Sequence, residues 1–259
     1  MVPKPWYEIN GERFTGNEPN FYRPEDFPWI KTLEDNWRTI RDEIQTLLAR
    51  DERRLRPYFI NLAFPPKQWK IMGMYFWKYK IHKNCRACPR TARLLESLPN
   101  MTAGSLSVLE PGSNINPHHG DTNAIIRIHL GLSIPAGMPQ CGFQVGKEIR
   151  EWREGKVLMF CDAHPHSAWN HSDRQRLILI VDVMKPEFTA QADAVCAHVL
   201  ATSGLQVLYQ RFAVLRGMPS SLKFAIHFFM RAVLRVILPV QRRAGFPARS
   251  VVRRKSRTL

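Results

Sequence analysis

The stretches SLSVLEPGSNINPHHGDTNAIIRIHLGLSIP (residues 105–135) and KVLMFCDAHPHSAWNHSDRQRLILIVDVMKP (residues 156–186) decide the fold of this chain. Short apolar runs rich in β-branched residues alternate there with clusters of Gly, Pro, Asn and Asp. This pattern is typical of an antiparallel β-sandwich or barrel. We therefore expect a mainly β domain whose strands include residues 107–109, 124–135, 156–160 and 177–183.

Histidines stand at the ends of two of these runs. His118 and His119 follow the first, and His164 and His166 follow another roughly fifty residues later. The mouth of a jelly roll can supply two imidazoles to one metal ion in this way, leaving positions open for oxygen chemistry. Taken singly, each of the nine histidines is better explained as a surface or core residue. Only the motifs around them raise the metal hypothesis.

Length and charge limit the organisation of the chain. Its 259 residues suit one main domain with an appendage, and the net charge of +16 is unevenly distributed. The 66 residues after Asp193 carry 12 of the 38 Lys and Arg and no acidic residue. We predict an N-terminal arm and supporting helix (1–55), a β domain (56–195) and a basic helical tail (196–259) with an anionic partner.

The cysteines and the N-terminus predict a reducing, cytoplasmic location. Five cysteines are an odd number, and no apolar segment follows a basic start. Cys85 and Cys88 form a CxxC, but no second pair is present to complete a zinc site and no thioredoxin-like context surrounds it. We interpret this segment as a loop before a short helix at 91–98, with zinc as a minor alternative.

Two further helices are predicted from apolar periodicity. One runs from Pro28 to Leu48 and packs on the β domain. The other spans 221–238 and ends at Pro239. Its surface is apolar except for a narrow polar stripe of four residues, Lys223, His227, Arg231 and Arg235. This helix either lies in a membrane interface, followed by a polybasic segment from Arg242 to Arg257, or packs on the domain with its stripe outward. No stretch is long and apolar enough to predict a spanning helix.

Five motifs in series resemble the aspartyl/asparaginyl β-hydroxylase family. They are LEPGSNINPH (109–118), RIHLGLSIP (127–135), WREGKVLMFCD (152–162), HSAW (166–169) and RLILIVDVMKPE (176–187). The resemblance implies a double-stranded β-helix, or cupin-like jelly roll, with flanking helices. It also implies an Fe(II)- and 2-oxoglutarate-dependent dioxygenase that uses O2 and releases succinate and CO2.

The resemblance assigns roles position by position. His118 and His166 look like the iron ligands, because His118 stands nine residues before the Arg of RIHLGL and His166 opens HSAW. The remaining assignments are Ser107, His129 and Arg176 to 2-oxoglutarate, and Arg127 and Trp169 to the substrate. The guanidinium group of an arginine can bind both oxygens of a buried carboxylate at once, which the ammonium group of a lysine does not do in the same geometry.

A second register remains open. His119 and Asp121 form the His-x-Asp pattern that many such dioxygenases use, one residue later than His118. The spacing to Arg127 instead places Gly120 where the carboxylate would stand. We favour two histidines with water in the third position, and keep His119 with Asp121 as the alternative.

Three hypotheses about the substrate and the function remain open. The first is an aspartyl or asparaginyl side chain of a peptide or amino acid. However, the family's R-x-R pair is Ile125 and Arg127 here, so one arginine is missing. The second is a lipid acyl chain, as in the family's bacterial hydroxylases of lipid A and ornithine lipids, with the basic tail on an anionic membrane. The third is a non-catalytic binding module. A nucleic-acid partner is disfavoured, because no aromatic residues are interleaved with the terminal arginines.

Overall fold

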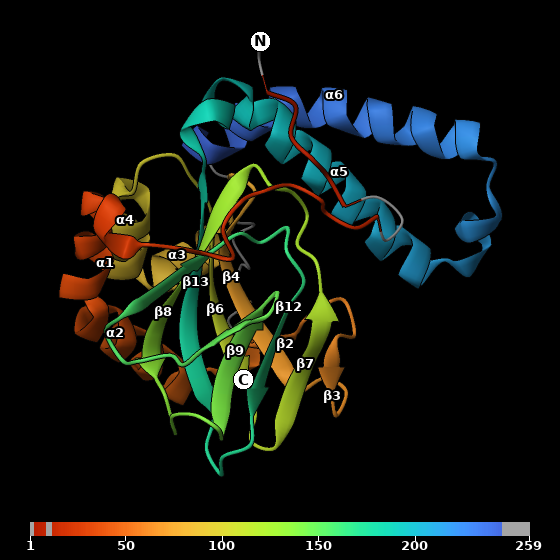
Figure 1. The fold of residues 1–259 in the computed structure, drawn as a ribbon. Coiled ribbons are helices and arrows are strands. Elements are labelled where there is room, and N and C mark those ends of the chain that lie inside the picture. Colours follow the sequence, from red (N-terminus) through yellow and green to blue (C-terminus); the bar gives the residue numbers. More distant parts are fainter. Residues whose placement is uncertain (1–2, 9–11, 245–259) are drawn as a thin grey trace, which may run out of the picture.

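The computed structural model describes residues 3–8 and 12–244, with side chains up to Gln241, and consists of two facing antiparallel sheets with helices outside them (Figure 1). The strand order of the larger sheet is β1 (Phe21–Tyr22), β11 (Val157–Phe160), β8 (Ile125–Ser133), β13 (Arg176–Met184), β6 (Met101–Leu109), β4 (Trp69–Phe76) and β2 (Arg56–Pro57), with β5 (Tyr79–Lys80) also paired to β4. The smaller sheet has the order β10 (Glu148–Arg150), β9 (Cys141–Val145), β12 (His166–Asn170), β7 (Ser113–His118) and β3 (Ala63–Phe64). The predicted jelly roll with flanking helices is confirmed.

Strand alternation separates the packing residues from the residues of the pocket. Successive side chains of a strand point to opposite faces. In β13, Leu177, Leu179 and Val181 belong to the core beneath the helices, whereas Ile178 and Ile180 face the space between the sheets. The same alternation runs through β8 and β6. Polar residues that lie an even number of positions along the strand from Ile178 and Ile180 therefore point into the space between the two sheets.

The first four helices cover the outer face of the larger sheet (Figure 1). They are α1 (Lys31–Asp35), α2 (Trp37–Arg50), α3 (His82–Ala87) and α4 (Pro89–Ser97). Ile40 and Ile44 of α2 and Leu95 of α4 are fully buried against the sheet. The predicted supporting helix is thus present, although it is interrupted at Asn36, whose backbone leaves the helical region.

The CxxC does not lie in a loop as predicted. Cys85 is buried on α3, where its Sγ lies 3.3 Å from the carbonyl oxygen of Met74, and Cys88 joins α3 to α4. Both thiols pack in the core beneath the helices. Within the described residues, no group of three or more potential ligands could hold a metal ion, so the zinc alternative gains no support from the geometry.

Two long helices follow the β domain. They are α5 (Ala192–Arg211) and α6 (Ser220–Ala244), joined through the 3-10 helix η5 (Ala213–Gly217), and they lie side by side at one end of the molecule (Figure 1). The expected boundary after residue 195 falls inside α5. Pro239 lies within α6 instead of ending it, which corrects the prediction. No helix in the described part of the chain is long and apolar enough to cross a membrane.

Candidate active site

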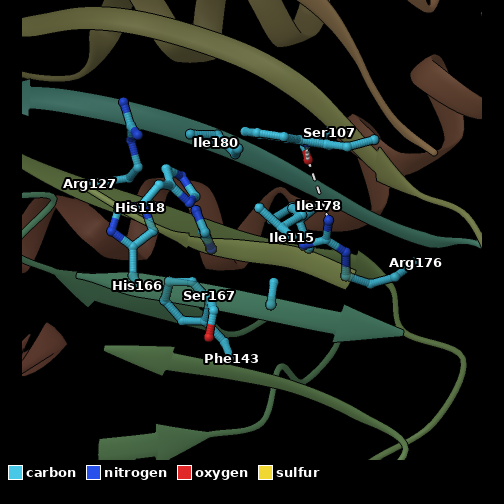
Figure 2. A pocket seen from close by; sticks show the side chains of 13 residues that line it. Ser107, Ile115, His118, Arg127, Phe143, His166, Ser167, Arg176, Ile178 and Ile180 are labelled. Atoms are coloured by element: carbon cyan, nitrogen blue, oxygen red, sulfur yellow. Dashed lines mark hydrogen bonds between the residues drawn. The ribbon is translucent and has the colours of Figure 1, made fainter. Parts of the chain in front are cut away.

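Two predicted metal ligands meet across neighbouring strands of the smaller sheet. His118 ends β7 and His166 begins β12, and the two residues are direct partners in the antiparallel pairing. Their ring centroids are 4.2 Å apart. Figure 2 shows both imidazoles at one end of a cavity between the sheets. The strand pairing therefore places side by side two histidines that are distant in the sequence.

Backbone carbonyl groups fix the tautomer of both rings. Nδ1 of His118 lies 2.9 Å from the carbonyl oxygen of Asn116, and Nδ1 of His166 lies 2.9 Å from that of His164. A carbonyl oxygen only accepts, so each Nδ1 carries the hydrogen and donates it, which leaves a lone pair on Nε2. Burial lowers the pKa of both imidazoles to about 3. Both rings are thus neutral and ready to act as ligands near pH 7.

A buried carboxylate lies beside this pair. Oδ1 of Asp162 is 3.6 Å from Nε2 of His166, and Asp162 Oδ2 is buried without a hydrogen-bond partner. Oδ1 already accepts a hydrogen bond from Arg127, whereas Oδ2 is a buried acceptor that a cation or a donor would satisfy. Two neutral imidazoles with free Nε2 lone pairs in one cavity are donors that an iron-like divalent cation takes. The residues present therefore fit the metal that the sequence predicts.

Gly120 makes the approach of Asp162 possible. Its N–H donates to the carbonyl oxygen of Asp162 at 2.8 Å, and a Cβ at this position would lie 1.7 Å from Asp162 Oδ2. Any side chain at residue 120 would displace the carboxylate. The position that a His-x-Asp pattern would fill with an acidic residue is therefore occupied by the carboxylate of Asp162, from another loop.

Arg127 holds a buried ion network. Its Nη1 donates to Asp162 Oδ1 at 2.6 Å, and its Nε and Nη2 donate to the two oxygens of Asp182 at 2.7 and 2.8 Å. Burial alone would lower the pKa of Arg127, but the charges of Asp162 and Asp182 raise it well above its ordinary value. The guanidinium lines the cavity, yet two carboxylates already balance its charge.

The other end of the cavity contains a cation without a counter-ion. Arg176 is buried, and its Nη2 donates to Ser107 Oγ at 3.4 Å (Figure 2). Its guanidinium lies 4.6 Å from the ring centre of Trp152, and Nε has no partner. Burial lowers its pKa to about 10, and no carboxylate among the described residues pairs with it. Such a charge needs an anionic ligand.

His129 stands between the two ends. Its Nδ1 accepts a hydrogen bond from Trp152 Nε1 at 3.4 Å, which leaves the hydrogen on its own Nε2 as a donor. Burial and the nearby charge of Arg176 lower its pKa well below the ordinary value. Ser107, His129 and Arg176, the predicted 2-oxoglutarate residues, thus line one cavity with the two histidines.

Three other predicted residues lie outside the lining of this cavity. His119 Nδ1 contacts the carbonyl oxygen of Ala163 at 2.8 Å, and its ring faces the N-terminal arm. Asp121 lies in the following loop, where burial raises its pKa to about 7. Trp169 points to the outer face of β12, because it is three residues from His166, and its Nε1 donates to the carbonyl oxygen of Pro139. The assignment of Trp169 to the substrate stays a prediction without geometric support.

Sequence reasoning missed the acidic members of the site. Asp162 and Asp182 belong to two of the motifs, but the motifs assign them no role. Each is a buried charge in or directly after an apolar β-run, which normally signals a paired or ligating residue. Trp152, which contacts both His129 and Arg176, likewise opens a motif that assigns it no role.

Comparisons with known proteins identify the family of this chain. Residues 34–186, more than half of the chain, match the family model described as aspartyl/asparaginyl beta-hydroxylase. The chain belongs to the aspartyl/asparaginyl β-hydroxylase family. Among its curated relatives is the ornithine lipid ester-linked acyl 2-hydroxylase of Rhizobium tropici, 34% identical over 66% of this chain and 62% of the relative. The human aspartyl/asparaginyl beta-hydroxylase is 36% identical over 62% of this chain but only 22% of its own length.

The remaining comparisons concern a further relative and the fold. The human aspartate beta-hydroxylase domain-containing protein 2 is 35% identical over 66% of this chain and 48% of its own. The chain therefore spans less than two thirds of the length of these relatives. Among solved structures, a cupin 2 conserved barrel domain protein from Salinispora arenicola aligns with 55% of this chain and 90% of its own, at 13% identity and a TM-score of 0.34.

Metal binding distinguishes the two registers. We expect His118→Ala to weaken Fe(II) or Co(II) binding at least about 100-fold, because it removes a ligand, and Asp121→Ala to leave the affinity within about threefold, because Asp121 is not in the cavity lining. Anaerobic titration followed by equilibrium dialysis measures both. Loss of binding in Asp121→Ala would contradict the register based on His118.

Stability of the metal-free protein should depend on pH through the two imidazoles. In the folded state they stay neutral down to pH about 3, whereas in the unfolded chain they take up protons below about pH 6.5. Protons therefore favour the unfolded state, and the free energy of unfolding should fall as the pH drops below 6.5, by up to about 1.4 kcal/mol per pH unit for each ring. Urea unfolding of the protein and of His118→Asn/His166→Asn tests this. An equally steep decline in the double variant would contradict it.

Proposed function

We propose that this chain is an iron(II)- and 2-oxoglutarate-dependent hydroxylase. The observation that carries the proposal is the pairing, within one cavity, of two metal-ready imidazoles with a buried arginine that lacks a counter-ion. An acid with a second carboxylate can bind at both ends of such a cavity. Membership of a β-hydroxylase family supports the same chemistry.

The roles follow from the contacts. His118 and His166 would hold the iron through Nε2, with Asp162 as the neighbouring negative charge. Arg176 and Ser107 would bind the distal carboxylate of 2-oxoglutarate, and His129 Nε2–H is a donor for one of its oxygens. The buried aromatic residues Trp152 and Phe143 keep water away from this end of the cavity.

The reaction is a coupled oxidation. Iron(II), when bound with 2-oxoglutarate and O2, supplies the oxidising power needed to attack an unactivated C–H bond. Substrate C–H, O2 and 2-oxoglutarate become substrate C–OH, succinate and CO2, with one oxygen atom of O2 in the hydroxyl group and the other in succinate. The protein contributes orientation and exclusion of water, because its own residues carry no redox chemistry in this scheme.

The charge balance near the iron bears on the substrate. An acidic side chain requires a free cation, but Arg127 already donates to Asp162 and Asp182, and Ile125 is buried in the cluster with α5. We therefore favour a neutral reacting segment, and specifically a lipid acyl chain, as in the Rhizobium relative's name. An aspartyl or asparaginyl side chain remains the second candidate, since the Arg127 side chain is 20% exposed and lines the cavity.

Removing the unpaired arginine tests the co-substrate site. Arg176→Gln should raise the KM for 2-oxoglutarate about 100-fold, because a buried charge-assisted contact is lost, while metal affinity changes little. The control is Arg174→Gln, which removes a neighbouring but exposed guanidinium. Succinate formation measures turnover. An unchanged KM in Arg176→Gln would contradict the assignment, and absence of 2-oxoglutarate turnover in the native protein would favour the non-catalytic module.

The mass and the fragmentation of the product identify the substrate class. The protein should be incubated with iron(II), 2-oxoglutarate and either a bacterial lipid extract or a peptide digest. We expect lipid species heavier by one oxygen atom, with fragmentation that places the oxygen on an acyl chain. A product confined to the peptide digest would contradict the lipid assignment and establish the aspartyl or asparaginyl candidate.

A further inference from the structure

Three of the four residues of the polar stripe of α6, Lys223, His227 and Arg231, are partly buried, whereas Arg235 is exposed. His227 Nε2 lies 3.1 Å from Thr202 Oγ1 of α5, and its ring meets that of His198 edge to face at 4.8 Å. Lys223 Nζ donates to the carbonyl oxygen of Arg216 at 2.7 Å, and Nε of Arg231 is buried. The sequence-based alternative, in which the stripe points outward, is therefore wrong. The two helices meet through polar contacts, supplemented by apolar ones such as Leu238.

The outer surface of this helix pair is consequently apolar. Of the fifteen large apolar side chains that are exposed in the described part of the chain, twelve lie between Val207 and Val240. Phe224, Phe228 and Phe229 are 71%, 63% and 68% exposed, and Val214 of η5 is 83% exposed. A surface helix of a soluble domain normally has the opposite orientation, with its apolar face inward. A contiguous exposed apolar face of this kind marks an interaction surface.

The charge around this face identifies its partner. Arg211, Arg216 and Arg235 are exposed around it, and the chain has no acidic residue after Asp193. A second copy of the chain docking through the same face would bring these like charges together, which is unfavourable. Anionic phospholipid supplies both missing components, since its acyl region accepts the phenylalanines and its phosphates attract the arginines.

The helix pair is connected to the loop after His118 through the N-terminal arm. Tyr7 stacks on His198 of α5 at 3.8 Å between ring centroids and forms a bridge with Thr122, in the loop that follows His118. α5 is therefore separated from the ligand loop by one aromatic residue. Figure 1 shows the helix pair projecting beyond the sheets on this side.

We propose that the apolar face formed by η5 and α6 docks on the surface of a lipid bilayer that contains anionic phospholipid. Phe224, Phe228 and Phe229 insert into the interface and the surrounding arginines contact phosphates. The docked helix pair thereby holds the loop after His118, which Tyr7 links to α5, near the bilayer. This surface does not depend on the iron site, although it agrees with a lipid substrate.

Vesicle binding of the full chain tests the proposal. The protein is sedimented with phosphatidylcholine vesicles alone or with vesicles that also contain phosphatidylglycerol. We expect tight binding to the anionic vesicles, weakened by high salt. Phe224→Ser/Phe228→Ser should lower the partition coefficient at least about tenfold, since each phenylalanine loses its apolar contact. The control Phe64→Ser/Ile149→Ser alters two side chains that are 64% and 50% exposed but lie on the β-sheets, and it should bind like the native protein.

Three results would overturn the proposal. They are equal binding by the Phe224→Ser/Phe228→Ser variant, absence of binding to anionic vesicles by the native protein, and a native dimer in solution that this variant dissociates, which would assign the face to a second copy. Turnover of 2-oxoglutarate, measured in parallel without vesicles, reports on the iron site separately. A failure of the docking surface is thereby distinguishable from a failure of the proposed chemistry.

Discussion

The buried ion network of Arg127 with Asp162 and Asp182 holds the site together. It joins β8, β13 and the loop after β11, and that same loop leads into β12 and His166. Asp162 also receives the N–H of Gly120 from the loop after His118. Asp162 therefore contacts the loop after His118 through its backbone carbonyl oxygen and Arg127 through its carboxylate. Loss of Asp162 or Asp182 would leave the other charges buried and uncompensated, which is far more costly than the loss of a surface ion pair.

The same network divides the cavity by charge. At the end with the two histidines, Asp162 and Asp182 balance the charge of Arg127 and the imidazoles are neutral, so their Nε2 lone pairs are free to bind a cation. At the other end, Arg176 has no counter-ion among the described residues. An anion is thus attracted to one end and a cation to the other. This asymmetry matches a dicarboxylic co-substrate that spans the cavity beside a bound metal, and it leaves little uncompensated positive charge for an acidic substrate.

The sequence predicted the fold and much of the cavity because strand alternation is a local property. Long apolar runs marked β8, β11 and β13, and the spacing between motifs selected His118 and His166, which the strand pairing brings together. Strands β9 and β10 escaped because glycine and polar residues interrupt their apolar residues, whereas β11 is apolar throughout. The pairing of Arg127 with Asp182 could not be predicted from the sequence either, because it depends on the register between β8 and β13. In that register Asp182 lies opposite Arg127. For α6, periodicity revealed a polar stripe but not which side meets α5.

A crystal structure with a divalent metal and 2-oxoglutarate tests the central claim most directly. The metal should lie on Nε2 of His118 and His166, with the distal carboxylate of 2-oxoglutarate on Arg176 and Ser107, and with Asp162 still bound to Arg127. A metal held by His119 and Asp121, or a co-substrate that leaves Arg176 unpaired, would contradict it.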